Sequence, residues 1–409
     1  MSWRKVQIAE FLDDGGIDIL TGPFGTQLKA SHYTSEGTPV INVRNVGYGD
    51  LRPEKLEFIP DQVVSRLSKH LLETRDIVFG RKGAVDRHLF VSESETGWMQ
   101  GSDCIRIRVL TDAIYPAFLS FALRLPSHKQ WMLTQCSNKA TMASLNQDVI
   151  GRIPVNLPDP ATQAEIASIL SAYDDLIENN RRRIQLLEQA ARLLYREWFV
   201  YLRFPGHEHV SITDGVPEGW TPTTIPDIGR VVTGKTPSKK KKSYYGDDIP
   251  FIKTPDIHGN TLVIKTDESL SEEGANTQAN KTLPSRSILV SCIGTVGAVA
   301  LNSSIAQTNQ QINAIVPTNE SLRYWTLFMA KDLKPVLEGM GGGSTMANVN
   351  KSKFSNIKVV IPSSLMLDQF NSFVAIQIDQ IEQLVLMNLQ LIQARDLLLT
   401  RMMNGKVAV

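Results

Sequence analysis

The residues with the strongest apparent chemistry are Gly229, Gly234, Lys235 and Thr236, which match the GxxxxGKT spacing of a phosphate-binding loop. Such a loop needs a buried strand before it and a helix that begins at the lysine, so that backbone amides point at the phosphates. Here Pro237 follows the match at once, and a serine and four lysines come next, with no apolar helix face. The sequence therefore predicts a tight glycine turn at this place and no nucleotide site.

Other catalytic and metal-binding patterns are missing from the sequence. There is no HExxH motif, no DPPY- or NPPF-like tetrapeptide of an amino-methyltransferase, and no convincing paired-carboxylate nuclease core. His207 and His209 lie in a connecting segment, and we interpret them as surface residues. The three cysteines form no CxxC pair, which indicates a reducing compartment and argues against a zinc ribbon or a disulfide scaffold. We therefore expect no catalytic residue, no metal and no cofactor on this chain.

Basic side chains, some of them beside aromatic residues or amides, are the remaining polar signal. Four lysines precede two tyrosines within residues 239–245, and three amides at residues 309–311 precede an apolar strand. Lysine and arginine bind phosphates, and asparagine or glutamine can pair with adenine in the major groove. A solvated charged loop and an ordinary turn are the simpler interpretations of these two segments. Together the signals predict DNA contacts from Lys29, Arg44, Arg81, Lys82, Arg87, Lys139, Lys235, Lys239, Lys240, Lys241, Lys242, Tyr244, Lys253, Asn309, Gln310 and Gln311.

The bulk properties are those of a soluble protein of two or three domains. The chain has 409 residues and a formal net charge of +1, so any contact with nucleic acid has to come from local patches. Its start has no apolar signal core, and its longest mostly apolar run, residues 288–301, is too short to span a bilayer. We expect a cytoplasmic protein that has no membrane contact.

The elements that must position the basic residues occur twice. TMASLN at residues 141–146 returns 204 positions later as TMANVN at residues 345–350, and the shift then holds without a gap. Further toward the N-terminus, the strand and glycine turn of residues 76–83 match residues 287–294 at a shift of 211. Each copy contains short strands joined by turns and few helices. The predicted fold class is therefore α+β, with two pseudo-symmetric copies, and not a doubly wound sheet.

One strand in the first copy shows a clear period of two. Ile105, Ile107 and Val109 alternate with Arg106 and Arg108. This alternation predicts a half-buried strand with both arginines on its other, solvated face.

Each copy ends in a long helix with apolar residues at alternating steps of four and three, which is a heptad seam. A helix of about 35 residues is about 50 Å long and cannot bury its stripe alone. Packing on a globular core is the simpler interpretation of such a stripe, but the two copies can bury each other as a coiled coil, and one asparagine in each seam would fix the register. The predicted seam comprises Ile166, Leu170, Tyr173, Ile177, Asn180, Ile184, Leu187, Leu194, Ile381, Leu384, Asn388, Leu391 and Leu398.

The order of these parts predicts the architecture. An antiparallel helix pair with a short linker would place two related α/β domains at opposite ends of a rod, inverted by a pseudo-two-fold axis. The predicted boundaries are 1–158 for the first domain, 159–200 for the first long helix, 201–219 for the linker, 220–362 for the second domain and 363–404 for the second long helix.

Over essentially its whole length the sequence resembles the specificity subunits of type I restriction–modification systems. The resemblance rests on PEGW at residues 217–220, GKTP at 234–237, the two TMxxxN loops, YREWF at 195–199 and NGKV at 404–407, together with the duplication. It implies two target-recognition domains that read the two halves of a split DNA sequence. It also implies that the helix pair sets the distance between the half-sites.

The resemblance implies partners as well. Two modification subunits would dock around the helices and supply S-adenosylmethionine-dependent adenine methylation, and restriction subunits would add ATP-driven translocation and cleavage. S-adenosylmethionine and ATP are then expected on the partners, and double-stranded DNA is the ligand of this non-catalytic chain. The alternatives are a duplicated DNA-binding or scaffold protein that acts without a methyltransferase, and a P-loop hydrolase.

Overall fold

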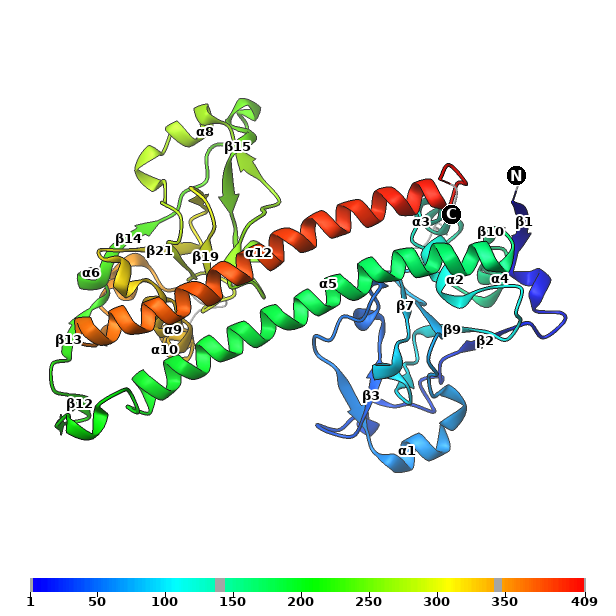
Figure 1. Cartoon of the computed structure of the whole chain (residues 1–409), viewed down its shortest axis with the longest axis horizontal. Coiled ribbons are helices and arrows are strands. Elements are labelled where there is room, and N and C mark those ends of the chain that lie inside the picture. Colours follow the sequence, from blue (N-terminus) through cyan, green and yellow to red (C-terminus); the bar gives the residue numbers. More distant parts are fainter. Residues whose placement is uncertain (1–2, 137–143, 342–347, 408–409) are drawn as a thin grey trace. The chain divides into compact units, whose positions relative to one another are not determined.

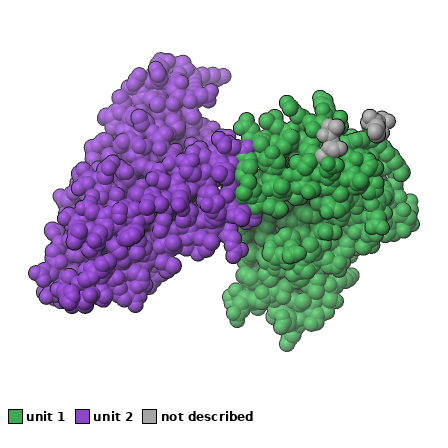
Figure 2. Space-filling model, viewed as in Figure 1, with its two compact units in different colours: residues 1–177, 391–409 green, residues 178–390 purple. Residues whose placement is uncertain are grey.

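The computed structural model describes residues 3–136, 144–341 and 348–407 of the chain (Figure 1). The chain forms two compact units (Figure 2). Unit 1 comprises Met1–Ile177 and Leu391–Val409, and unit 2 comprises Glu178–Gln390. Lys139, one of the predicted DNA contacts, lies outside the described residues.

Unit 1 is built from three small sheets with the strand orders β1-β10, β2-β9-β6-β7-β4 and β5-β3-β8. Most pairs are antiparallel, while β3 pairs with β8 and β4 pairs with β7 in parallel. The strands are β1 Arg4–Gln7, β2 Ile17–Thr21, β3 Thr38–Ile41, β4 Tyr48–Gly49, β5 Glu57–Ile59, β6 Ile77–Gly80, β7 His88–Phe90, β8 Met99–Gln100, β9 Cys104–Val109 and β10 Pro154–Leu157.

Unit 2 repeats the strand order of unit 1 in all three sheets, as β13-β22, β14-β21-β18-β19-β16 and β17-β15-β20, after a short hairpin of β11 and β12. The strand pairs equivalent to the two parallel pairs of unit 1 are also parallel: β15 pairs with β20, and β16 pairs with β19. The strands are β11 Ile212–Thr213, β12 Val216–Pro217, β13 Thr221–Thr224, β14 Gly229–Thr233, β15 Tyr245–Ile252, β16 Leu262–Val263, β17 Ser269–Leu270, β18 Ile288–Ser291, β19 Val299–Asn302, β20 Gln307–Thr308, β21 Ile312–Pro317 and β22 Lys358–Ile361. The predicted duplication and the α+β fold class are confirmed.

Short helices cover the sheets at matching places in the two units. In unit 1 these are α1 Asp61–Arg66, α2 Pro116–Ala122, α3 Pro126–Cys136 and α4 Gln147–Gly151. In unit 2 they are α6 Ile225–Ile228, α7 Thr254–Ile257, α8 Glu272–Asn276, α9 Arg323–Asp332, α10 Lys334–Gly341 and α11 Lys351–Ser355. Helix α2 follows β9 and helix α9 follows β21, and each is followed directly by a second short helix, α3 or α10.

The prediction that β9 is half-buried is wrong. Arg106, which was expected on a solvated face, is as buried as its neighbour Ile105. The strand lies in the middle of its sheet, between β2 and β6. Both faces of that sheet carry a core, because Ile77 of β6 belongs to one apolar cluster and Val78 to another. The Arg106 guanidinium is tolerated there because it forms an ion pair with Asp18 on the edge strand β2.

The two long helices are α5 Pro160–Tyr195 and α12 Ser364–Met402. Asp159 caps the start of α5, where its carboxylate accepts hydrogen bonds from the amide and the hydroxyl of Thr162 at 3.0 and 2.7 Å. These bonds hold the pKa of Asp159 below its usual value. At the other end α5 continues as one π-helical turn, Arg196–Val200. Helix α12 ends before Gly405, whose φ of +64° is the left-handed conformation typical of a glycine after a helix.

Each unit contains the beginning of one long helix and the end of the other. In unit 1, Ile166 of α5 and Met402 of α12 are buried in the same apolar cluster. In unit 2, Phe370 of α12 and Tyr195 and Trp198 at the end of α5 share one aromatic core. A helix that begins where its partner ends must run antiparallel to it, so the predicted antiparallel pairing is confirmed within each unit.

Candidate nucleic-acid interface

The GKTP segment is a structural turn. Residues 229–233, which would form the phosphate-binding loop, are the strand β14, and no helix begins at Lys235. Gly234 lies so close to the segment between β20 and β21 that a Cβ added to it would be 2.2 Å from the backbone oxygen of Asn309. Gly22 holds the same place in unit 1, where a Cβ would be 2.0 Å from the oxygen of Gly101. The predicted tight glycine turn is therefore confirmed, and its glycine serves close backbone packing.

A tight turn after β6 carries two of the predicted DNA contacts, Arg81 and Lys82. Gly83 in this turn has a φ of +75°, and the matching Gly294 after β18 has a φ of +79°. The end of the TMASLN loop packs against the turn, since the Leu145 amide donates to the Arg81 oxygen at 2.8 Å. Lys82 is half-exposed and forms an ion pair with Asp103 at 3.0 Å. A backbone hydrogen bond thus links the turn to the end of the loop. Unit 2 has the equivalent bond, in which the Val349 amide donates to the Cys292 oxygen at 2.8 Å.

Arg87 belongs to a cationic cluster that the sequence did not predict. Its guanidinium lies 5.1 Å from the centre of the Tyr48 ring, and the Lys129 ammonium lies 4.6 Å from the same centre. Lys129 also donates to the Tyr48 hydroxyl at 2.9 Å, and that hydroxyl donates to Asp86 at 3.1 Å. Tyr48, Arg87 and Lys129 come from three distant parts of the chain, so no local sequence signal joins them. Lys129 also forms an ion pair with Asp86 at 3.4 Å and is partly neutralised, so Arg87 is the cation of this cluster that is better placed to contact a phosphate backbone.

The four lysines of residues 239–242 are not equivalent. Lys239 pairs with Glu268 at 3.5 Å, and Lys241 pairs with Glu273 and lies 4.4 Å from the centre of the Tyr244 ring. Lys253, another predicted contact, also pairs with Glu268, at 2.9 Å. A hydrogen bond from Lys253 lowers the pKa of Glu268, and one from Lys241 lowers the pKa of Glu273. These three lysines are therefore partly neutralised within unit 2.

Lys240 and Lys242 are the exposed members of this run that form no ion pair among the described residues. Lys235 is exposed as well, and its backbone amide donates to the Thr308 oxygen at 2.9 Å, which fixes the turn below it. Three ammonium groups at this tip of unit 2 therefore have no carboxylate partner there, and they are the strongest candidates for phosphate contacts in this unit.

The amide cluster before β21 serves mainly the turn. Asn309 is buried, its side-chain amide donates to the side-chain oxygen of Gln311 at 2.9 Å, and its own side-chain oxygen accepts from the Gln311 backbone at 3.1 Å. Gln310 is exposed and accepts a hydrogen bond from Thr236 at 2.6 Å. The simpler interpretation, a turn former, thus describes Asn309 and Gln311. Of the three, Gln310 is the one available to a base edge.

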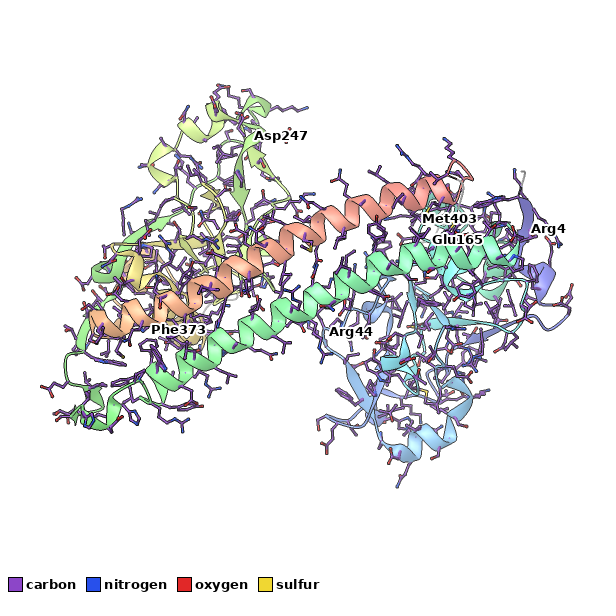
Figure 3. All side chains as sticks on the ribbon, in the orientation of Figure 1. Arg4, Arg44, Glu165, Asp247, Phe373 and Met403 are labelled. Carbon is purple, nitrogen blue, oxygen red and sulfur yellow. The ribbon has the colours of Figure 1, made fainter. Side chains whose placement is uncertain are left out.

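The remaining predicted contacts of unit 1, Lys29 and Arg44, lie in the segments before and after β3. Arg44 is exposed (Figure 3) and pairs with Glu57 at 2.6 Å. Lys29 is exposed at the start of the 3-10 turn Ala30–His32. Neither residue lies in a pattern that marks it for chemistry, and each is placed at the surface by the loops around β3.

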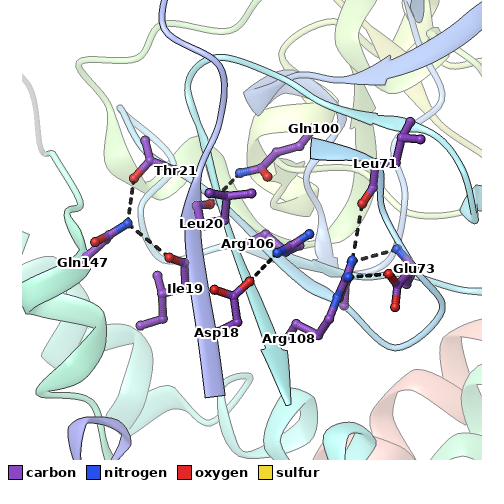
Figure 4. A network of polar contacts seen from close by, with 11 residues as sticks. Asp18, Ile19, Leu20, Thr21, Leu71, Glu73, Gln100, Arg106, Arg108 and Gln147 are labelled. Atoms are coloured by element: carbon purple, nitrogen blue, oxygen red, sulfur yellow. Dashed lines mark hydrogen bonds and ion pairs between the residues drawn. The ribbon is translucent and has the colours of Figure 1, made fainter. Parts of the chain in front are cut away.

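A network of polar contacts joins β2, β9 and the segments beside them (Figure 4). Arg108 forms two ion pairs, one with Glu73 and one with the buried Asp76 at 2.7 Å, and its hydrogen bonds to Asp76 raise the pKa of Arg108. Gln100 donates from its side-chain amide to the Leu20 oxygen at 2.8 Å. These contacts are internal, so the two arginines of β9 hold the fold together and are not presented to a ligand.

The structure brings the predicted seam residues of the long helices to the buried or half-buried faces of α5 and α12. Asn180 and Asn388 are joined in unit 2 by a hydrogen bond of 2.9 Å. In unit 1, Asp174 of α5 accepts hydrogen bonds of 2.6 Å from Arg395 of α12 and from Arg124. The buried members are Ile166, Leu170, Ile177, Asn180, Ile381, Leu384 and Asn388, and the half-buried members are Tyr173, Ile184, Leu187, Leu194, Leu391 and Leu398.

Within residues 3–136, 144–341 and 348–407, no three His, Cys, Asp or Glu side chains are gathered in a way that would hold a metal ion. Cys104, Cys136 and Cys292 are free and buried, and burial raises the pKa of Cys104 to about 12 and that of Cys292 to about 11. Such thiols stay protonated and unreactive at neutral pH. In the part of the chain that the structure describes, no helix has the length and apolar character needed to cross a membrane.

Comparison with known families decides between the remaining interpretations. The family model of the type I restriction modification DNA specificity domain matches the chain twice, at residues 19–189 and 217–379. The chain belongs to the type I restriction–modification DNA specificity family. The first match begins inside β2 and ends inside α5, and the second begins just before β13 and ends inside α12. Each match therefore contains the five-stranded and three-stranded sheets of one unit and the first part of the long helix that follows them.

Relatives in the specificity family cover most of the chain. It is 29% identical over 405 residues to the type I restriction enzyme HindI specificity subunit of Haemophilus influenzae, covering 83% of this chain and 88% of that one. The MjaIX specificity subunit of Methanocaldococcus jannaschii is 22% identical over 306 residues, 73% of this chain and 70% of that one. The crystal structure of a type I S subunit from M. genitalium has the same fold, with a TM-score of 0.60, 15% identity and coverage of 98% and 96%.

Proposed function

We propose that this chain is the DNA-reading, non-catalytic subunit of a type I restriction–modification complex, that it acts in the cytoplasm, and that each of its units reads one half of a bipartite duplex sequence. The observation that carries the proposal is the repeated strand order of units 1 and 2. Two copies of one reader in one chain suit a target with two half-sites. Each copy has its own cationic loops, around Lys82 and Arg87 in unit 1 and around Lys240 and Lys242 in unit 2.

The proposal assigns the chemistry to partners. Two modification subunits would supply S-adenosylmethionine and methylate adenine, and restriction subunits would supply ATP-driven translocation and cleavage. The near-neutral net charge of +1 supports this division, because partners would share the phosphate contacts. On this chain the residues would bind and orient DNA, with lysine and arginine on phosphates and Gln310 on a base edge.

The outer faces of the long helices support docking of the modification subunits. In unit 2, Leu186, Leu193 and Val200 follow one another at heptad spacing along α5 and its π-helical extension, and all three are exposed. On α12, Phe373 (Figure 3) and Ile376 are exposed at a spacing of three residues. Apolar stripes of this kind on the solvent side of a helix pair are typical of surfaces that a partner covers.

An exchange of one reader tests the proposed function. Residues 220–362 would be replaced by the corresponding region of another specificity subunit, and the chain would be produced with its modification subunits. Sequencing of methylated DNA should show that one half of the methylated sequence changes and the other half is kept. If both halves stay the same, the two-reader proposal is wrong. If no adenine is methylated by the wild-type complex, the alternative of a DNA-binding or scaffold protein without a methyltransferase gains support.

Introducing positive charge into the apolar stripe tests the docking face. The double variant Leu186→Lys/Leu193→Lys should lose co-purification with the modification subunits, because two ammonium groups would replace the apolar contact. Both side chains are exposed, so the unfolding temperature of the chain alone should change little. Ile305→Lys, on an exposed loop between β19 and β20, is the matched control and should leave the complex intact. Equal recovery of the complex with the double variant would contradict the assignment.

A further inference from the structure

We call the three-stranded sheet of each unit, together with the 3-10 turn and the short helix beside it, the outer lobe of that unit. Each outer lobe has a lysine at the same structural position. Lys29 precedes the 3-10 turn Ala30–His32, which leads to β3, and Lys241 precedes the 3-10 turn Lys242–Tyr244, which leads to β15. In each unit a short helix, α1 or α8, follows the partner strand β5 or β17 and lies near this turn. The two lobes can therefore be compared residue by residue.

The charge around this lysine differs between the units. In unit 2 the second residue of α8 is Glu273, and its carboxylate forms an ion pair with Lys241. In unit 1 the second residue of α1 is Gln62, which is neutral. Four residues later unit 2 has Thr277, whereas unit 1 has a second cation, Arg66. The same place thus holds a closed ion pair in unit 2, whereas in unit 1 it holds two cations that form no ion pair with any residue the structure describes.

In unit 1 these residues line an open cavity of about 520 Å³, which we call the anion pocket. Its lining side chains are mostly hydrogen-bond donors, and none of them is acidic: Thr26, Lys29, His32, Gln62, Val63 and Arg66.

The polar side chains of the anion pocket are positioned by backbone contacts. Arg66 donates one guanidinium hydrogen bond to the Gln27 oxygen at 2.8 Å, which anchors it on the loop before β3. The Nδ1 atom of His32 accepts from the Lys29 amide at 3.2 Å, so that its Nε2 atom carries the proton and is a donor. The rest of the Arg66 guanidinium, an ammonium, a hydroxyl, an amide and an imidazole N–H then line one pocket. The ligand that accepts from such a set is an oxyanion with several oxygens, of which phosphate is the tetrahedral, charged example.

We propose that the anion pocket is a phosphate-binding subsite of unit 1, and that its ligand is a backbone phosphate of the DNA bound by this unit. The choice of DNA as the source rests on the proposed function, while the choice of phosphate rests on the pocket alone. In unit 2 Glu273 occupies the ligand's place on Lys241, so that lobe depends instead on Lys240 and Lys242. The two readers therefore hold the DNA backbone by different residues, in spite of their shared fold.

The first experiment measures duplex binding by the full chain assembled with its modification subunits, as a function of salt. Gln62→Glu gives unit 1 the carboxylate of unit 2, and Arg66→Ala removes the guanidinium. Each should lower the affinity several-fold for all duplex sequences and reduce the slope of log K against log salt by about 0.9, the value for one lost phosphate contact. Asn156→Glu and Lys5→Ala make the same charge changes on the paired strands β10 and β1, outside this lobe, and should leave the slope unchanged.

The second experiment titrates the chain with inorganic phosphate by calorimetry. Wild type should bind phosphate, and Gln62→Glu should not. Loss of phosphate binding together with a reduced salt slope supports the whole proposal. Loss of phosphate binding with an unchanged slope supports the subsite and makes its ligand a free anion. If neither variant differs from its control in either experiment, the proposal is overturned. If the wild-type complex binds no duplex at all, the proposed function fails, and the phosphate titration alone decides the pocket.

Discussion

The side-chain amide of Asn180 on α5 donates a hydrogen bond of 2.9 Å to the side-chain oxygen of Asn388 on α12, and both residues are buried. A polar pair inside an apolar seam costs stability but fixes which residues face each other, because any shifted register leaves both amides in an apolar environment. The pair therefore sets the alignment of the two helices in unit 2. In the proposed function, that alignment contributes to the distance between the half-sites.

Breaking this pair from one side should destabilise the chain. Asn388→Leu removes the acceptor of the Asn180 amide, whose own oxygen already has no partner among the described residues, and should cost about 1–3 kcal/mol. The double variant Asn180→Leu/Asn388→Leu should recover much of that loss, because an apolar pair needs no partner. Denaturant unfolding of the four chains of the cycle measures the coupling. Additive effects would contradict the role assigned to the bond.

Replacing the carboxylate that joins two arginines should loosen unit 1. Asp174 accepts hydrogen bonds of 2.6 Å from Arg124 and from Arg395, and all three side chains are mostly shielded from solvent. Asp174→Asn should cost about 2 kcal/mol, less than a fully buried pair, because part of the carboxylate is exposed. Glu178→Gln is the control, since its pair with Arg181 is at the surface and should contribute little. Equal midpoints of unfolding for the two variants would refute this prediction.

A methyl group at the turn after β6 should strain the backbone. Gly83 has a φ of +75°, where an added Cβ meets no atom within 4 Å, so the effect of Gly83→Ala is conformational and not steric. We expect a loss of about 1 kcal/mol, measured by thermal unfolding. Gly25→Ala, also in open space but without a positive φ, should cost nothing and can stabilise the chain slightly. If Gly25→Ala lost more stability than Gly83→Ala, the turn at Gly83 would not be held in this conformation.

Acid should weaken unit 1 through His128. Burial lowers the pKa of this imidazole to about 4 from its ordinary value of 6.5. Between these two values the unfolded chain binds more protons than the folded one, so stability rises with pH across this window. The contribution, about 3 kcal/mol, is fully present above pH 6.5 and is lost as the pH falls toward 4.

The variant His128→Gln isolates this effect from other titrating groups. Its unfolding temperature should fall less than that of wild type between pH 7 and pH 5, although its packing against Trp131 is altered at every pH. His209→Gln, at an exposed position, should keep the wild-type dependence. If the unfolding temperature of His128→Gln changed with pH as much as that of wild type, the His128 imidazole would not be held neutral in the folded chain.

The lysines at the tip of unit 2 should contribute unequally to DNA binding. Lys240→Ala/Lys242→Ala removes two ammonium groups without a carboxylate partner and should reduce the salt slope of duplex binding by up to about 2. Lys239→Ala/Lys241→Ala removes the same charge, but it also takes Lys241 from Glu273 and leaves Glu268 paired with Lys253 alone. If Lys239 and Lys241 hold these carboxylates and not DNA, the second double variant lowers affinity with a smaller change in slope. Equal slopes for the two variants would show that the ion pairs open on binding.

The sequence by itself determined the duplication, the α+β class and the antiparallel helix pair. These features follow from signals that the chain carries locally or repeats: the TMxxxN loops, the heptad spacing of apolar residues and the glycine turns. It also determined the rejection of the P-loop, because Pro237 directly after the match excludes the helix that phosphate binding requires.

Only the tertiary structure decided what each charged side chain does. Arg106 alternates with apolar residues as a surface arginine would, yet the layer on its other face buries it against Asp18. Lys29 and Lys241 occupy the same position in the repeat, but Glu273 neutralises one and Gln62 leaves the other facing an open pocket. Partners of this kind lie tens of residues away along the chain. The effective charge of a residue therefore depends on which distant side chains the fold brings within a few ångströms, and no local pattern carries that information.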